Sequence, residues 1–154
     1  MNICQLLSPE STQCCDKTNS KKKVLEKISE MMANSIDCKA QSIFESLLNR
    51  EKLGTTALGD GVAIPHARVN HCKCATAVFL LLDKPIDYDA PDGKPVDIIF
   101  AILVPEDANN SHLEHLQKIA KLLSDSKIIS QIRHAHCDEA LYDILEKAAD
   151  RLAA

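Results

Sequence analysis

The chain has 154 residues, 45% hydrophobic and 26% charged, with a formal net charge of −4. This profile predicts one globular domain over residues 1–154 with an adequate core. The acidic balance argues against a nucleic-acid partner, and the lack of a basic leader or of 18 consecutive apolar residues predicts a protein that is neither exported nor membrane-embedded. Seven cysteines without a secretion signal favour reduced thiols, so we expect a cytoplasmic protein.

The first two predicted elements are helices. From Ser20 onward, the stretch SKKKVLEKISEMMANS predicts a helix, with an apolar stripe from Val24 to Met32 at helical spacing. A second amphipathic pattern predicts a helix over 39–50, ending near Gly54, a residue that can adopt the backbone of a helix cap. This boundary places Arg50 in the last helical turn or just after it.

The second half of the chain alternates strand and helix signals. Short apolar runs rich in Val and Ile predict central strands over 75–82 and 96–105, and the Pro- and Gly-rich segment between them has room for an edge strand around 86–88. After Pro105, Ser111 and Glu114 form a capping box that places His112 at the first position of a helix. A last helix is expected from about Asp138. Helices around central strands indicate an α/β domain.

The segment GDGVAIPHARV, residues 59–69, contains a histidine whose surroundings constrain the backbone. Gly59, Asp60 and Gly61 predict a tight turn, and Pro65 fixes its own φ and lacks an N–H donor. His66 is therefore held by the backbone rather than by packing. From the residues alone, it is equally a displayed nucleophile or a strand-end histidine without a role.

Phosphoryl transfer is a reaction that such a histidine could perform. A neutral imidazole can attack phosphorus with one nitrogen while the other donates a hydrogen bond. The negative charge of the transferring group requires cationic or N–H donors, which Arg50 and His112 could supply. Read alone, Arg50 also fits a solvated arginine that interacts with the last carbonyls of its helix.

A metal site is the alternative of another class. His66, His71, Cys72 and Cys74 are of metal-ligand type and lie close together in the sequence. Their spacing matches no standard zinc-finger arrangement. The sequence predicts neither a bound metal nor a cofactor, and a His/Cys metal-binding interaction module is kept as a competing hypothesis.

The blocks NREKLGTTALGDGVAIPHARV, PVDIIFAILVP and SHLEHLQKIAKLL resemble the type-2 enzyme IIA domains of the bacterial phosphotransferase system, with the nitrogen-regulatory IIA proteins as the most similar subfamily. The resemblance extends from about residue 3 to 150. It implies a mixed five-stranded sheet flanked by helices on both faces, the mannitol/fructose-type IIA fold. Where many relatives have P-H-G-K, this chain has Pro65-His66-Ala67-Arg68.

The resemblance also implies a function. His66 would accept a phosphoryl group from an HPr-like histidine phosphocarrier that is charged from phosphoenolpyruvate, and Arg50 and His112 would stabilise that group. The expected output is regulation of target proteins according to phosphorylation state. A mannitol- or fructose-type transport IIA, which passes the group to a IIB partner, is the alternative within the same chemistry.

Overall fold

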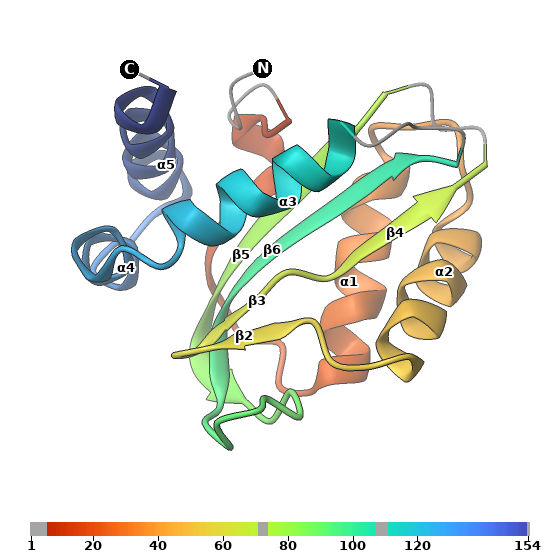
Figure 1. Cartoon of the computed structure of the whole chain (residues 1–154), viewed down its shortest axis with the longest axis horizontal. Coiled ribbons are helices and arrows are strands. Elements are labelled where there is room, and N and C mark those ends of the chain that lie inside the picture. The colour runs from red at the N-terminus through yellow and green to blue at the C-terminus, as the bar shows by residue number, and fades with distance from the viewer. Residues whose placement is uncertain (1–5, 71–73, 107–110, 154) are drawn as a thin grey trace.

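The computed structural model describes residues 6–70, 74–106 and 111–153, and the side chains of residues 111, 112, 152 and 153 lie outside that description. Its centre is a mixed sheet in the order β1-β5-β6-β3-β2, with β4 also paired to β6 (Figure 1). The strands are β1 (Thr12–Asp16), β2 (Ala57–Gly59), β3 (Val62–Ala63), β4 (His66–Val69), β5 (Thr76–Ile86) and β6 (Val96–Pro105). The helices are the 3-10 turn η2 (Pro9–Ser11), α1 (Lys21–Ala33), α2 (Ala40–Lys52), α3 (Ser111–Leu122), α4 (Ser126–Arg133) and α5 (Asp138–Ala153).

Strands β3 and β4 are two halves of one line along β6. Val62 pairs with Ile98 and His66 pairs with Ile102, both in parallel orientation and with the same offset in numbering. Pro65 interrupts the ladder because it has no N–H, while its carbonyl still accepts the N–H of Ile102 at 2.9 Å. The described sheet thus has six strands, and the expected five correspond to counting this interrupted line once.

The two central strands bury both of their faces. Along β5, Phe79 and Leu81 belong to one core cluster, and Val78, Leu80 and Leu82 belong to the other. The first cluster packs under α3, α4 and α5, and the second under α1 and α2, so helices cover both faces of the sheet, as expected (Figure 1). This alternation explains why the sequence of each central strand is continuously apolar.

Most predicted elements are present with small shifts of their ends. The helix expected from Ser20 is α1, and the side chain of Ser20 caps it by accepting the N–H of Lys23. The helix expected over 39–50 is α2, and α3 begins at Ser111. The expected separate strand around 86–88 is wrong: Ile86 is the last residue of β5 and pairs with Val96, because the β5–β6 ladder continues past residues 83–85.

Among the described residues, no helix combines the length and apolar character needed to cross a membrane. The five cysteines that the structure describes are free thiols, namely Cys14, Cys15, Cys38, Cys74 and Cys137.

Candidate functional site

His66 is the first residue of β4 and its side chain is half-buried. Its Nδ1 lies 2.8 Å from the carbonyl oxygen of Ile64, two residues earlier. Because a carbonyl can only accept, Nδ1 carries the hydrogen, and in the neutral ring the lone pair is on Nε2. The interrupted strand therefore supplies both the position of the histidine and its tautomer.

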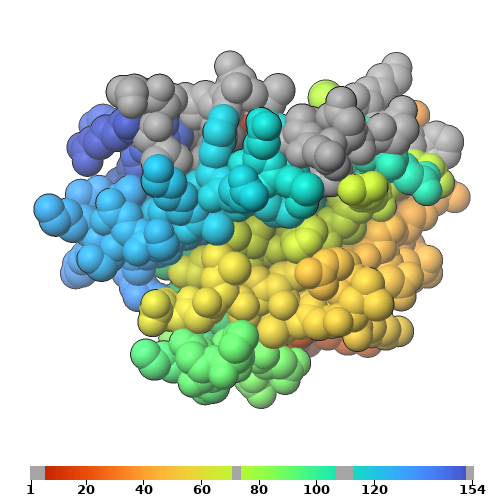
Figure 2. Space-filling view, viewed as in Figure 1, coloured from red at the N-terminus to blue at the C-terminus, as the bar shows by residue number. Residues whose placement is uncertain are grey.

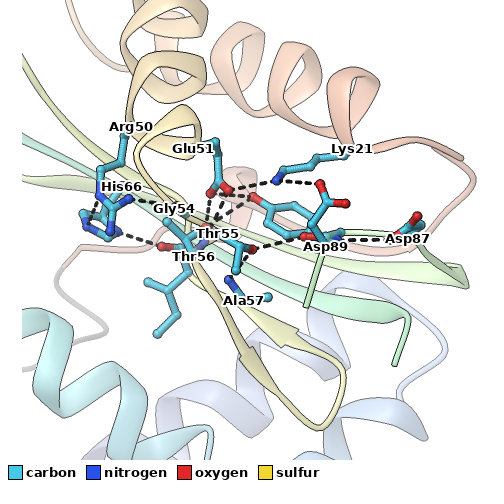
Figure 3. A network of polar contacts seen from close by, with 12 residues as sticks. Lys21, Arg50, Glu51, Gly54, Thr55, Thr56, Ala57, His66, Asp87 and Asp89 are labelled. Atoms are coloured by element: carbon cyan, nitrogen blue, oxygen red, sulfur yellow. Dashed lines mark hydrogen bonds and ion pairs between the residues drawn. The ribbon is translucent and has the colours of Figure 1, made fainter. Parts of the chain in front are cut away.

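Arg50 lies in the last turn of α2 and reaches the same histidine. Its Nε–H donates to Nε2 of His66 at 3.3 Å, and its Nη1 donates to the carbonyl of Gly54 at 3.0 Å (Figure 3). One edge of the guanidinium thus binds a carbonyl just past its helix and the other faces the histidine, while its contact with a phosphoryl group stays a prediction. The structure brings Arg50 and His66 together although 16 residues separate them.

A groove of about 600 Å³ passes this pair. It runs between α2 and α3 over β4, whose yellow-green surface lies between the orange of α2 and the cyan of α3 in Figure 2. Its rim carries two leucines with unusually exposed side chains, Leu53 at 85% and Leu113 at 50%. The lining consists of Ser46, Asn49, Arg50, Leu53, His66, Ala67, Arg68, Ile102, Val104, Leu113 and Leu116.

His112 is the second residue of α3, directly before the groove residue Leu113. The side chain of His112 lies outside the described residues, as does that of the expected capping residue Ser111. Its contact with a phosphoryl group stays a prediction.

Glu51 was not singled out by the sequence analysis, and it is the centre of the polar network beside the site. Its side chain is only 3% exposed, and its carboxylate accepts hydrogen bonds from the N–H and the hydroxyl of Thr56 and from the hydroxyl of Tyr88 at 3.2 Å. Lys21 forms an ion pair with it at 3.0 Å (Figure 3). Burial raises the pKa of Tyr88, and the charge of Glu51 raises it further. The one sequence signal for this network was the position of Glu51 beside Arg50.

In the part of the chain that the structure describes, no group of three or more His, Cys, Asp or Glu side chains is arranged to hold a metal ion. Of the four residues considered, His71 and Cys72 lie outside the described residues, and Cys74 is exposed.

Comparison with known proteins supports the family that the motifs indicated. The family model described as "Phosphoenolpyruvate-dependent sugar phosphotransferase system, EIIA 2" matches residues 5–148. This match covers nearly the whole chain, including both halves of the groove and the segment that carries His66. The chain therefore belongs to the type-2 enzyme IIA family of the phosphotransferase system.

Within this family, the chain is similar to nitrogen regulatory proteins. It is 44% identical to the nitrogen regulatory protein of Pseudomonas aeruginosa over 142 residues, which cover 92% of each chain. The crystal structure of nitrogen regulatory protein IIA-Ntr from Neisseria meningitidis superposes with a TM-score of 0.87 at 39% identity, covering 93% of this chain and 98% of the other. The mannitol IIA of Escherichia coli, at 19% identity and a TM-score of 0.76 over 90% of this chain and 98% of its own, shares the fold.

Proposed function

We propose that this protein is a phosphohistidine carrier of the nitrogen-related phosphotransferase system, in which Nε2 of His66 accepts the phosphoryl group. One observation carries the proposal: Nδ1 of His66 is bound to the carbonyl of Ile64, so the nucleophilic nitrogen is the one beside Arg50 in the groove. We further propose an HPr-like phosphocarrier as the donor.

In the transfer step, the Nε2 lone pair of His66 forms a bond to phosphorus while the bond between phosphorus and the donor's imidazole nitrogen breaks. The electron pair of the broken bond stays on the donor ring. The positive charge that develops on the His66 ring is stabilised by the Nδ1–H bond to Ile64, which holds the ring in place throughout.

Arg50 must release Nε2 for this bond to form. The guanidinium then supplies N–H donors to the equatorial phosphoryl oxygens, where negative charge accumulates, and its bond to Gly54 keeps it within reach. His112, in the first turn of α3, is the proposed second donor to the same oxygens.

The groove rim supports docking of a protein rather than a small substrate. Leu53, directly after α2, and Leu113, in α3, expose large apolar side chains in the groove that holds His66, as a protein partner that must bring its own histidine to Nε2 would require. Phosphorylation adds roughly two negative charges beside these leucines, which gives target proteins a surface by which to distinguish the two states.

The regulatory interpretation is favoured over the transport alternative by the similarity to nitrogen regulatory proteins over almost the full chain, whereas the mannitol protein shares the fold alone. The free thiols fit the proposed cytoplasmic location.

The test is incubation with phosphoenolpyruvate, enzyme I and the histidine phosphocarrier, followed by intact-mass analysis. We expect one acid-labile phosphoryl adduct on the wild-type chain and none on His66→Ala. His134→Ala is the matched control, because the Nδ1 of this exposed histidine also lies near a backbone carbonyl, that of Ser130 at 2.6 Å. An unmodified wild-type chain, or an adduct that survives in His66→Ala, contradicts the proposal.

A further inference from the structure

We propose that Glu51 is a positioning residue for phosphoryl transfer: its buried carboxylate sets the geometry in which Arg50 meets Nε2 of His66. The inference rests on the proposed function of His66. Glu51 does not line the groove, and its carboxylate is bonded to Thr56, Tyr88 and Lys21, so we infer that its effect is transmitted through the backbone on both sides of the site.

The first branch leads from Glu51 to Arg50. The backbone N–H and the hydroxyl of Thr56 both donate to the carboxylate, which closes the segment between the end of α2 and the start of β2. Gly54 lies inside this closed segment, with its N–H donated to the carbonyl of Glu51 at 3.1 Å. The carbonyl of Gly54 then accepts Nη1 of Arg50, so the carboxylate fixes the group that orients the guanidinium.

The second branch leads from Glu51 to His66. The carbonyl of Thr56 accepts the N–H of Ile64 at 3.0 Å, and the carbonyl of Ile64 accepts Nδ1–H of His66. Both branches lead from Glu51 through Thr56, and they meet again at the contact between Arg50 and His66. Six residues form a closed ring of covalent and hydrogen-bonded links, namely Arg50, Glu51, Gly54, Thr56, Ile64 and His66. Figure 3 labels all of them except Ile64.

Two further donors fix the carboxylate itself. Tyr88, which is fully buried, donates to Oε1, and Lys21 at the start of α1 lies 3.0 Å from Oε2. The Lys21 ammonium also lies 4.5 Å from the centre of the Tyr88 ring. A buried carboxylate is costly unless its oxygens are fully bonded, and here four donors from three parts of the chain satisfy them. These donors therefore hold the Glu51 carboxylate in a single position and orientation.

The charge and both oxygens of Glu51 are needed for this arrangement. In Glu51→Gln, an NH₂ group at the Oε2 position would face the Thr56 N–H and the Lys21 ammonium, neither of which can accept. At the Oε1 position it would face the hydroxyls of Thr56 and Tyr88, which can accept from it but then lose the carboxylate as the acceptor for their own hydrogens. The closed segment loses either a hydrogen bond or the charged acceptor of the Thr56 hydroxyl, and in both cases the charge that pairs with Lys21, and we expect the Gly54 carbonyl and the Arg50 guanidinium to lose their fixed orientation.

The first measurement needs no phosphoryl donor. In ¹⁵N-resolved NMR spectra of the whole protein, we expect the wild-type Nε–H of Arg50 to give a discrete signal that exchanges slowly with water, since it is bonded to Nε2 of His66. In Glu51→Gln this signal moves toward that of exposed arginines and exchanges faster. Asp16→Asn is the matched control, because Asp16 is also a buried carboxylate bonded to a lysine and a backbone N–H, at the opposite edge of the sheet.

The second measurement is the rate of phosphoryl acceptance as a function of phosphocarrier concentration. We expect Glu51→Gln to lower the saturated rate by roughly 10- to 100-fold, the cost of a misplacement of about 1 Å. The half-saturating phosphocarrier concentration stays near the wild-type value because the rim leucines are unchanged. Asp16→Asn keeps the wild-type rate although it also loses stability.

If Glu51→Gln does not fold, a second pair of variants tests the positioning role of Glu51. Thr56→Val removes one donor to the carboxylate at nearly constant volume, and Thr56→Ser restores it. We expect Thr56→Val to lose the Arg50 signal and the rate, and Thr56→Ser to recover both. A wild-type Arg50 signal and rate in the folded Glu51 or Thr56→Val variant overturns the positioning role. A wild-type chain that accepts no phosphoryl group instead overturns the proposed function.

Discussion

Arg50 divides its guanidinium between two acceptors, the nucleophilic nitrogen of His66 and the carbonyl of Gly54. A flat, forked cation is suited to this division, because its N–H groups point in fixed and different directions. The same geometry allows the side chain to exchange one partner, Nε2, for a phosphoryl oxygen while keeping the other.

Two replacements of Arg50 test whether transfer needs the positive charge alone or also the forked shape of the guanidinium. We expect Arg50→Lys and Arg50→Ala both to fold, since the side chain is only half-buried, and to accept the phosphoryl group more slowly. Lys keeps the charge but cannot span both acceptors, so we expect a loss of about 10-fold, against about 100-fold or more for Ala. Single-turnover transfer kinetics provide the measurement, and a wild-type rate for Arg50→Lys would show that charge alone suffices.

The turn between β2 and β3 is connected to α4 by one side chain. Gly59, Asp60 and Gly61 all have positive φ, which confirms the turn predicted from the Gly-Asp-Gly sequence. Arg133, at the end of α4, donates to the carbonyl of Asp60 at 2.9 Å and forms paired hydrogen bonds with the carboxylate of Asp97. A Cβ at Gly61 would clash with Nη2 of Arg133, so it would displace the guanidinium that connects α4 to the turn.

Two glycine substitutions separate the cost of a positive φ from the cost of displacing Arg133. Gly93→Ala meets open space, and its positive φ of 71° alone costs about 1–2 kcal/mol. Gly61→Ala has the same backbone cost and also displaces Arg133, so we expect a loss that is larger by about 1 kcal/mol or more. Urea unfolding of the two variants gives the comparison. Equal losses would mean that the contact between Arg133 and the turn adds nothing to stability.

Across the whole molecule, the candidate site and the ion pair of the buried Asp16 lie at opposite edges of the sheet. His66 is on β4, whereas Asp16 ends β1 and pairs with Lys27 of α1. Burial alone would raise the pKa of Asp16, but hydrogen bonds from Lys27 and from Thr18 hold it below the ordinary value of 3.8. Stability and transfer should therefore respond to different groups.

This pKa predicts an acid dependence of stability. A carboxyl group whose pKa is lowered by folding contributes stability above its unfolded pKa and loses that contribution as the pH falls through the folded value. We expect wild-type stability to fall more steeply than that of Asp16→Asn as the pH is lowered from 5 to below about 4, so that the difference between the proteins is largest near neutral pH. Urea unfolding at a series of pH values measures the free energy of unfolding of both proteins. If the two free energies change in parallel with pH, the pKa of Asp16 is not lowered by folding.

The sequence predicted the parts of the fold that depend on local pattern. The apolar stripe and serine cap of α1, and the continuous apolar runs of β5 and β6, carry their signals within a few residues. Strand β1, with the sequence TQCCD, was missed because it alternates weakly and becomes a strand by pairing with β5, more than 60 residues away in the sequence. The partners of Glu51 were missed for the same reason, since Tyr88 is 37 residues away.

The continuous register across Pro65 constrains how the segment can vary in length. Val62 and His66 keep the same offset to β6, so His66 lies on the same face of the sheet as Val62 and Ile64. One residue inserted or deleted between them would move the imidazole to the opposite face, under α1 and α2, whereas a change of side chain would leave it in place. Homologous chains should therefore differ in the composition of this segment much more readily than in its number of residues.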